Sequence, residues 1–258
     1  MNLHVLEVQC AGLLVRVAVN GITVVNVDEP EDRTLTFNLN PYIIAGANSI
    51  AVALRLPDEK GAQAGPPAPA FVLSLRAGRH GADPGDAGRL MSYTWQAEMH
   101  PLSSGAWTIP FNHTATSAGD FGRWAWQDAA PGPINAENQI ALVHAVMALH
   151  QQCARGQPDA VLAAHQLKLL ELARATGLTE TAMRADLAAM LSSIMRAPDF
   201  KSADLQASDL ILVPLAEGRL VKVTCSDGAA PIRLSGGGKA LQLRPIYTTF
   251  QGRWALAR

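Results

Sequence analysis

The chain has 258 residues, of which 48% are hydrophobic and 17% are charged. That much apolar material can fill the cores of two ordinary domains, which excludes a globally disordered chain. The 21 basic and 22 acidic residues nearly cancel, so the charge balance gives no reason to expect nucleic acid or an anionic membrane as the partner.

Three cysteines, Cys10, Cys153 and Cys225, lie far apart in the sequence. This number and spacing are not typical of a disulfide framework, so we expect buried, reduced thiols; one bridge plus a free thiol is the alternative. The N-terminus lacks a basic segment, and Glu7 interrupts its apolar run, so it is not a signal peptide. No apolar stretch approaches the length of a membrane-spanning helix. If the chain begins at its natural start, we expect a cytoplasmic protein.

Residues 1–130 are predicted to form an all-β sandwich. Apolar residues alternate with polar ones between residues 3 and 27, which indicates three short strands. Asn20-Gly21 separates the last two of these strands and predicts a two-residue hairpin, because both central positions of a type I′ turn need positive φ. Further strands are expected at residues 33–39, 49–56, 71–75, 90–98 and 106–111.

The sequence of this first part contains two recognisable stretches. They read Val17-x-Val19-Asn20-Gly21-Ile22-x-Val24 and Phe37-x-Leu39-Asn40-Pro41-Tyr42-Ile43-Ile44-Ala45-Gly46-x-Asn48-x-Ile50-x-Val52. Together they resemble the galactose-binding-like jelly-roll sandwich. The resemblance covers about residues 13–56 and implies that these residues build turns and core. Such domains accompany many glycosidases, so the resemblance also suggests a carbohydrate-binding accessory module.

The clearest predicted boundary is Asp128-Ala129-Ala130-Pro131-Gly132-Pro133, because two prolines and a glycine extend neither a helix nor a central strand. Residues 131–258 are predicted to form an α+β domain. We expect three helices between residues 136 and 197, packed on antiparallel strands between residues 209 and 257. Asn135 and Thr179 are the predicted N-caps, and Gly177 is predicted to end the second helix.

This second part resembles the cystatin-like cone that includes nuclear-transport-factor-2-like domains. The resemblance rests on helices followed by strands and on the closing pattern Tyr247…Gly252-x-Trp254-x-Leu256. A small-molecule site in this part would need a polar-lined cavity between helices and sheet, with His144, Tyr247 or Trp254 at its wall.

Trp95, Trp107, Trp124 and Trp126 fall within 32 residues of a chain that is only 5% aromatic. Aromatic faces suit sugar rings and partner hot spots, so these four are the candidate ligand or partner contacts. The alternative is that they fill the sandwich core or the domain junction. If residues 119–126 form a strand, Trp124 and Trp126 point to the same side.

The remaining polar motifs do not indicate a metal or phosphate site. His150 and Cys153 lie three residues apart on an expected helix, but two ligands are too few for a structural zinc site. Gly236-Gly237-Gly238-Lys239 lacks the spacing of a phosphate loop and is expected to be a hairpin tip. The acidic run at residues 28–32 is expected to be a solvated loop. We therefore expect neither a metal nor a cofactor.

No catalytic constellation is recognisable, so an enzyme is the less favoured interpretation. The leading hypothesis is a non-catalytic binding or protein-interaction protein, whose partner is another protein or a second copy of the chain. A bacterial toxin-neutralising or secretion-accessory role would fit it. The alternatives are a carbohydrate-binding accessory module and a small-molecule-binding protein or enzyme that uses the C-terminal cavity.

Overall fold

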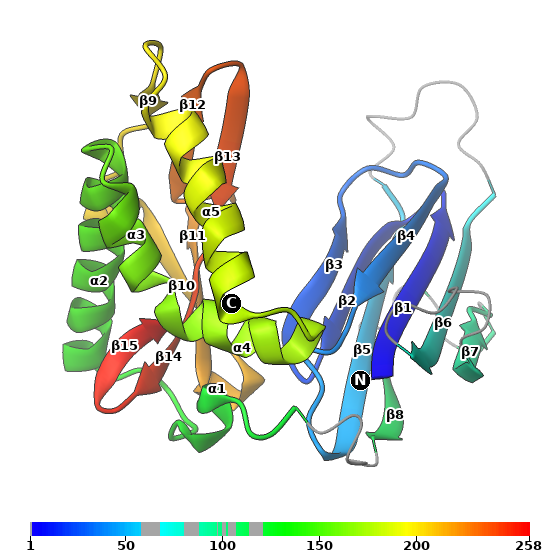
Figure 1. Cartoon of the computed structure of the whole chain (residues 1–258). Helices are drawn as coiled ribbons and strands as arrows, with labels where there is room; N and C mark the ends of the chain where they lie inside the picture. The colour runs from blue at the N-terminus through cyan, green and yellow to red at the C-terminus, as the bar shows by residue number, and fades with distance from the viewer. Residues whose placement is uncertain are drawn as a thin grey trace. The chain divides into compact units, whose positions relative to one another are not determined.

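The structure is a computed structural model that describes residues 2–57, 68–79, 88–96, 98–99, 102, 107–113 and 121–258. The chain divides into two compact units, Met1–Arg123 and Trp124–Arg258. Strands make up the first unit, and helices followed by strands make up most of the second, so the predicted order of secondary structure is confirmed. The two units can be followed by colour in Figure 1, and each is described by itself.

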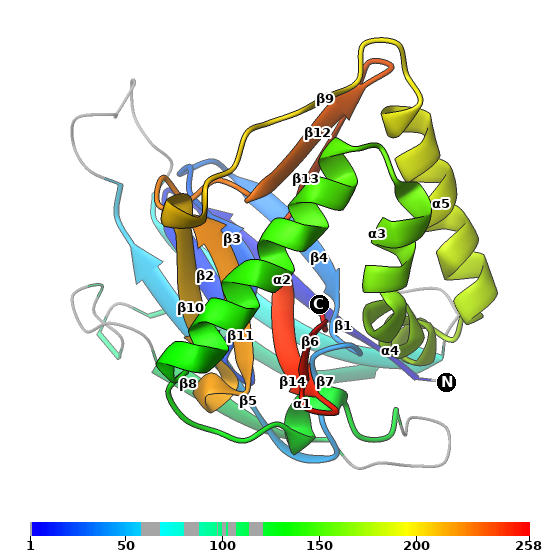
Figure 2. The ribbon, with the colours of Figure 1, turned by 90° about the vertical axis from the view of Figure 1, so that its left-hand side faces the viewer.

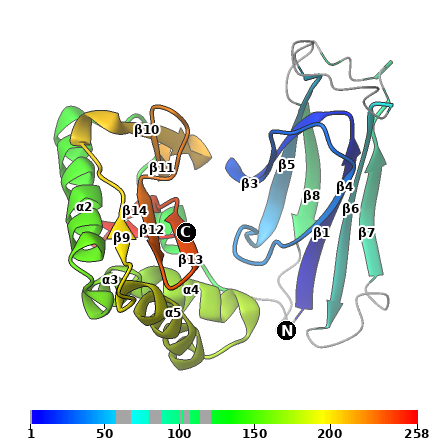
Figure 3. The same cartoon turned by 90° about the horizontal axis from the view of Figure 1, so that it is seen from above.

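The described part of the first unit consists of strands joined by turns and loops. They are β1 (Asn2–Ala11), β2 (Leu14–Val19), β3 (Ile22–Val27), β4 (Arg33–Asn38), β5 (Gly46–Arg55), β6 (Ala70–Arg79), β7 (Gly88–Thr94) and β8 (Trp107–His113). They pair antiparallel in two four-stranded sheets with the orders β4-β1-β6-β7 and β3-β2-β5-β8. The strands of both sheets are visible from above in Figure 3.

Each sheet of the first unit has one buried face. In β2, Val15, Val17 and Val19 are buried, whereas Arg16 between them is exposed. The same alternation occurs in β1, β5 and β6, whose buried residues are Leu6, Val8, Ile50, Val52, Leu54, Phe71, Leu73 and Leu75. Burial of one face only is typical of sheets that pack against each other in a β-sandwich.

The predicted hairpin at Asn20-Gly21 is confirmed, since Asn20 has φ of 50° and Gly21 has φ of 78°. The Asn20 side chain has a second function, because its Nδ2 donates to Oδ1 of Asn48 at 2.7 Å and to the Tyr42 carbonyl at 2.9 Å. Asn48 is buried and its Nδ2 donates to the carbonyls of Ile44 and Gly46. These bonds satisfy the buried Asn48 amide and the partly buried Asn20 amide, and they tie the hairpin to the turn that precedes β5.

The second unit contains helices followed by strands. The helices are α1 (Ala125–Asp128), α2 (Ala136–Ala154), α3 (Pro158–Ala164), α4 (Gln166–Thr176) and α5 (Glu180–Met195). The strands are β9 (Lys201–Ser202), β10 (Leu210–Leu215), β11 (Leu220–Cys225), β12 (Ile232–Gly236), β13 (Lys239–Leu243), β14 (Ile246–Phe250) and β15 (Arg253–Leu256). They form two sheets with the orders β10-β11-β14-β15 and β13-β12-β9, where we expected one.

The helix ends follow the predicted capping rules. Oδ1 of Asn135 accepts the N–H of Asn138 at 2.7 Å, and Oγ1 of Thr179 accepts the N–H of Ala182 at 3.1 Å. Gly177 ends α4 with φ of 73°. The second expected helix is divided at His165 into α3 and α4, so the expectation of three helices is too low. The N–H of His165 is shared between two carbonyls of α3, which tightens the chain there.

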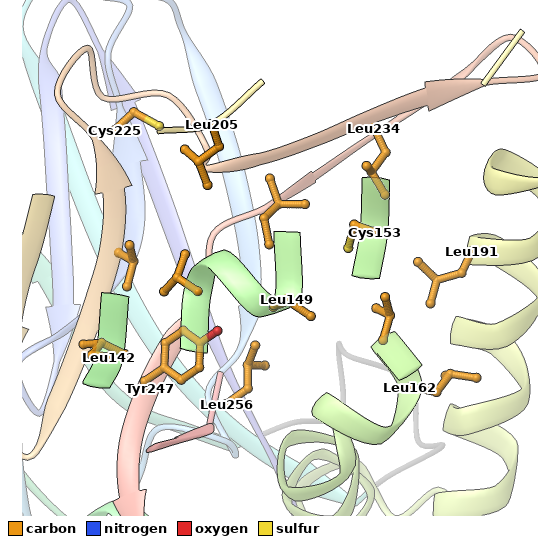
Figure 4. Packing of buried hydrophobic residues seen from close by; sticks show 14 of the residues in the cluster. Leu142, Leu149, Cys153, Leu162, Leu191, Leu205, Cys225, Leu234, Tyr247 and Leu256 are labelled. Carbon is orange, nitrogen blue, oxygen red and sulfur yellow. The ribbon is translucent and has the colours of Figure 1, made fainter. Parts of the chain in front are cut away.

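The core of the second unit lies between the helices and the sheets. Figure 2 shows α2 crossing in front of the sheet, and Figure 4 shows the side chains that meet beneath it. This cluster includes Leu142, Val146, Leu149 and Cys153 of α2, Leu191 and Ile194 of α5, and Val221, Val223, Tyr247 and Leu256 of the strands. Gly236 approaches α5 so closely that an added Cβ would lie 2.5 Å from the Ile194 carbonyl oxygen.

The segment around the predicted domain boundary packs with the second unit. Arg219 donates from one NH1 group to the carbonyls of Gln127 at 2.7 Å and Ala129 at 3.0 Å. The N–H of Gly132 donates to the Glu217 carbonyl at 2.8 Å. The division between compact units therefore falls after Arg123, ahead of the prolines at which we placed it.

Trp124 and Trp126 do not belong to a strand, which corrects the expectation for residues 119–126. Residues 125–128 form the short helix α1, and the Trp124 N–H is capped by Oε1 of Gln127 at 2.8 Å. The alternation of tryptophans resembles a strand pattern, but the Gln127 cap favours a helical turn. Residues 119 and 120 lie outside the described residues.

Candidate functional site

The outer face of the sheet β3-β2-β5-β8 carries a hollow of about 470 Å³. We call it the arginine hollow; its lining includes Leu14, Arg16, Asn26, Asp28, Ala53, Arg55 and Leu102. The strand register explains its position. Arg16 lies opposite Asn26 on β3 and opposite Ala53 on β5, and Leu14 lies opposite Arg55. These residues alternate with the buried core residues, so their side chains share the solvent side of the sheet.

Small side chains leave this part of the sheet face recessed relative to its surroundings. Ala18 pairs with Ala51, and Ala53 occupies the next position on the same side of β5. Alanine projects only one carbon from a pleated sheet, whereas the neighbouring Arg16 and Arg55 project long chains. A low apolar floor beside long cationic side chains produces a concave surface, which is the usual form of a ligand site.

The two arginines of the hollow are exposed, and within the described part of the chain neither makes an ion pair or a side-chain hydrogen bond. Arg33 shows the contrast, because its guanidinium pairs with Glu29 at 2.9 Å and Glu31 at 2.5 Å. Guanidinium groups stay protonated at all relevant pH values. Arg16 and Arg55 therefore provide two positive charges without an ion pair in a hollow whose lining also includes the Asp28 carboxylate.

Hydrogen-bond acceptors lie on the other side of the hollow, along β3. Nδ2 of Asn26 donates to Oδ2 of Asp28 at 2.5 Å. This bond holds both side chains in place and leaves Oδ1 of Asn26 and lone pairs of the Asp28 carboxylate able to accept further hydrogen bonds. The hollow therefore has a cationic end at β2 and β5 and an accepting end at β3.

The tryptophans that we singled out have different local surroundings. Trp95 is partly buried, and its backbone N–H donates to the Phe71 carbonyl at 2.9 Å. Trp107 lies in β8 opposite Val52, and its side chain lies outside the described residues. Trp124 has no exposed surface and Trp126 has 5%. A ligand would have to displace neighbouring groups to reach either of these two rings, and a binding role for the four stays a prediction.

Trp124 contributes to a buried charge cluster within the second unit. The guanidinium carbons of Arg174 and Arg258 each lie 5.0 Å from the centroid of its ring. Glu171, 1% exposed, pairs with the Arg258 guanidinium and accepts the N–H of Ala125 at 2.6 Å. The cluster thus links α1, α4 and the chain after β15, a structural function for this tryptophan.

The three residues expected at a C-terminal cavity have different surroundings in the fold. Tyr247 belongs to the apolar core, where burial and the neighbouring Cys153 thiol raise the pKa of its hydroxyl. Trp254 packs against that core and donates its Nε1–H to the Asn138 carbonyl at 2.9 Å. His144 is exposed and lines a groove of about 350 Å³ together with residues of α2 alone. The apolar packing around Tyr247 favours a core function for it.

The cysteines are buried and free, as expected. Burial raises the pKa of the Cys153 thiol to about 12. His150 is engaged with the Ala203 carbonyl, which lies 2.8 Å from its Nε2, so it does not form a ligand pair with Cys153. Within the residues that the structure describes, no three His, Cys, Asp or Glu side chains are grouped as metal ligands.

The turn at Gly237-Gly238 joins β12 to β13 with φ of 59° and 72°, so the glycine run is a hairpin tip as predicted. In the acidic run at residues 28–32, Glu29 and Glu31 are engaged with Arg33. Among the helices of the described chain, none combines the length and the apolar character needed to cross a membrane.

Sequence reasoning missed the arginine hollow. The available signal was an arginine, Arg16, on the polar side of a strand that faces small residues on its partner strand. Comparison with known proteins finds no matching family model and no significant match among curated proteins or solved structures. The geometry of the chain itself is therefore the basis for any statement about its function.

Proposed function

We propose that the chain is a non-catalytic binding protein and that the arginine hollow is its ligand-contact surface. The observation that carries this proposal is the pair of guanidinium groups without an ion pair that line a hollow of about 470 Å³ together with Leu14 and Ala53. Cavities of this size accommodate small molecules, and a few polar groups at the margin fix the orientation of a ligand. The proposal keeps the leading hypothesis from the sequence and moves the contact surface from the tryptophans to the arginines.

The proposal also keeps a jelly-roll-like sandwich of the galactose-binding-like type for the first unit. Two antiparallel four-stranded sheets and the Asn20-Gly21 hairpin support it. The packing of helices against antiparallel strands in the second unit is compatible with the cystatin-like cone, which stays a prediction. In this scheme the sandwich holds the ligand, and the carbohydrate-binding alternative uses the same face.

Nuclear magnetic resonance on the full chain tests the binding surface. The wild-type protein is titrated with neutral sugars, amino acids, organic acids and phosphates while its backbone amide resonances are followed. We expect at least one class to shift the amides of β2, β3 and β5, and Arg16→Gln/Arg55→Gln to abolish these shifts. Arg89→Gln, on the exposed part of β7, is the matched control and should leave them unchanged. If bound compounds shift only amides elsewhere, or the double variant binds normally, the proposal fails.

A second candidate function, self-association, is favoured by strand β10. This strand ends its sheet, and all six residues of Leu210–Leu215 are apolar, with 45% of the Ile211 side chain exposed. An apolar edge strand without a charged side chain is a template for pairing, and two identical strands can pair antiparallel about a two-fold axis. Pro214 has no N–H to donate, so the pairing would use the part of the strand that precedes it, residues 210–213. We expect sedimentation to show a dimer that Ile211→Lys dissociates and that Phe250→Lys, at a 40% exposed position of β14, does not. A monomeric wild-type chain would rule this function out.

A further inference from the structure

We propose that the arginine hollow takes a small polyhydroxylated organic anion, with its carboxylate or phosphate at Arg16 and Arg55 and its hydroxyl groups at Asn26 and Asp28. This inference rests on the proposed function, because it names the ligand class of the same site. It follows from the distribution of charge and hydrogen-bond acceptors across three neighbouring strands.

The cationic end of the hollow suits one anionic group. Arg16 lies opposite Ala53, and Arg55 is two residues further along the same strand, so the two arginines are diagonal neighbours on one face. Diagonal neighbours on adjacent strands have Cα atoms roughly 7–8 Å apart, which lets both long side chains reach the same group. Planar guanidinium groups bind carboxylate and phosphate oxygens with two parallel hydrogen bonds, and Asp28, the one carboxylate among the described lining residues, accepts from Asn26 and makes no ion pair with either arginine.

The accepting end excludes a second anionic group. Asp28 carries a negative charge and Asn26 already uses one amide hydrogen on it, at 2.5 Å. A ligand carboxylate placed here would meet like charge, whereas a hydroxyl group would donate to oxygen atoms that are able to accept. The ligand therefore combines negative charge at one end with hydrogen-bond donors at the other.

The distance between the two ends favours a ring-sized or chain-like polyol over a simple amino acid. Strands β3 and β5 flank β2, so the strands that carry Asn26 and Arg55 are separated by two strand spacings, or roughly 9–10 Å, whereas Arg16 lies opposite Asn26 at one spacing. An α-amino acid carries its carboxylate and its donor group on neighbouring carbons, which suits the short span from Arg16 to Asn26 but not the longer span from Arg55 to Asn26. A six-carbon hydroxy acid or a phosphorylated polyol has the necessary length, and its C–H groups can pack on the Leu14 and Ala53 floor.

Calorimetric titration of the full chain tests the ligand class with gluconate, glucose 6-phosphate, glucose, acetate, inorganic phosphate and alanine as probes. We expect gluconate or glucose 6-phosphate to bind about tenfold more tightly than glucose, because one charge-assisted interaction contributes about that factor. The first two probes distinguish a carboxylate from a phosphate source. Acetate and inorganic phosphate measure the contribution of charge alone and should bind about tenfold more weakly than the matching polyol anion.

Variants distinguish the two ends of the hollow. Arg16→Gln and Arg55→Gln should each weaken binding of the polyol anion about fivefold or more, and 0.5 M salt should weaken it further, because the pairs are exposed. Asn26→Ala should weaken binding of the polyol anion but leave inorganic phosphate unaffected. Arg89→Gln should change neither, and all variants should unfold at the wild-type temperature, because each replaces an exposed residue.

Two groups of outcomes would overturn the inference. Equal affinity for glucose and for the polyol anions would show that the site does not require a negative charge. Equal affinity for acetate and gluconate would show that it does not require hydroxyl groups. If alanine or another class shifts the amides of β2, β3 and β5 and the polyol anions do not, the ligand class is wrong although the proposed function stands. If no probe or class shifts these amides, the proposed function itself fails.

Discussion

Replacing Glu171 by glutamine should destabilise the second unit strongly. The Glu171 side chain is 2% exposed and the Arg258 side chain is 3% exposed, so both charges of this pair are buried. Glutamine has the same shape and can still accept the Ala125 N–H, but it removes the negative charge. The buried Arg258 guanidinium would then lose the counter-charge that Glu171 supplies, a loss worth about 3–5 kcal/mol of unfolding free energy. Arg174 adds little, because it is 39% exposed and lies 3.7 Å from the carboxylate.

Amide hydrogen exchange along α4 measures this loss within the second unit, and it does not require the whole chain to unfold in one step. Asp186→Asn, at an exposed position of α5, is the control and should change the free energy of opening by no more than about 0.5 kcal/mol. The double variant Glu171→Gln/Arg258→Met removes both charges and should recover most of the loss. The coupling between the two substitutions should be about 2 kcal/mol or more.

Two results would refute the reasoning about this pair. One is an opening free energy that falls by less than about 1 kcal/mol in a folded Glu171→Gln protein. The other is a double variant whose loss equals the sum of the two single losses, because additivity would mean that the charges do not act on each other.

Three further outcomes are expected. In a urea titration, Gly236→Ala should lower the unfolding free energy by about 1–3 kcal/mol, because its Cβ would lie 2.5 Å from the Ile194 carbonyl oxygen. Gly88→Ala, whose nearest contact is at 3.8 Å, should change the unfolding free energy little. Asn48→Ala should lower the unfolding free energy by about 2–4 kcal/mol, since it removes the four hydrogen bonds of the buried Asn48 amide, and unchanged urea unfolding of the first unit would contradict this. Burial lowers the pKa of His165 below its ordinary value, so the unfolded state binds more protons and stability falls as pH drops through about 6.5. His165→Gln should reduce this acid sensitivity in hydrogen exchange, and an unchanged pH profile would contradict the assignment.

Local rules accounted for much of the fold. The hairpin at Asn20-Gly21, the N-caps at Asn135 and Thr179 and the end of α4 at Gly177 each depend on one or two residues, so they could be predicted from sequence. Trp124-Ala125-Trp126 was misassigned because a short alternation fits both a strand and the first turn of a helix. The deciding contact, from Gln127 to the Trp124 backbone, depends on the conformation itself.

The candidate site depended on pairing between distant segments. Arg16 and Arg55 are separated by a long stretch of chain, and only the register of β2 with β5 places them on one face. The alternation of apolar and polar residues in β2 indicates that Arg16 faces solvent, but no local pattern indicates that Ala53 lies beside it. The tryptophan density suggested binding, whereas the structure uses Trp124 to pack two arginines of the second unit. Long-range register, which no local pattern encodes, is what sequence reasoning lacked.

The attachment of residues 124–133 determines how the two units can be produced separately. A recombinant fragment cut at Pro131 would lack Trp124 and would leave the Arg219 guanidinium without its two carbonyl acceptors. A fragment that begins just before Trp124 keeps both. Proteases that cleave flexible linkers should accordingly spare the proline-rich stretch, even though its composition marks it as the obvious target.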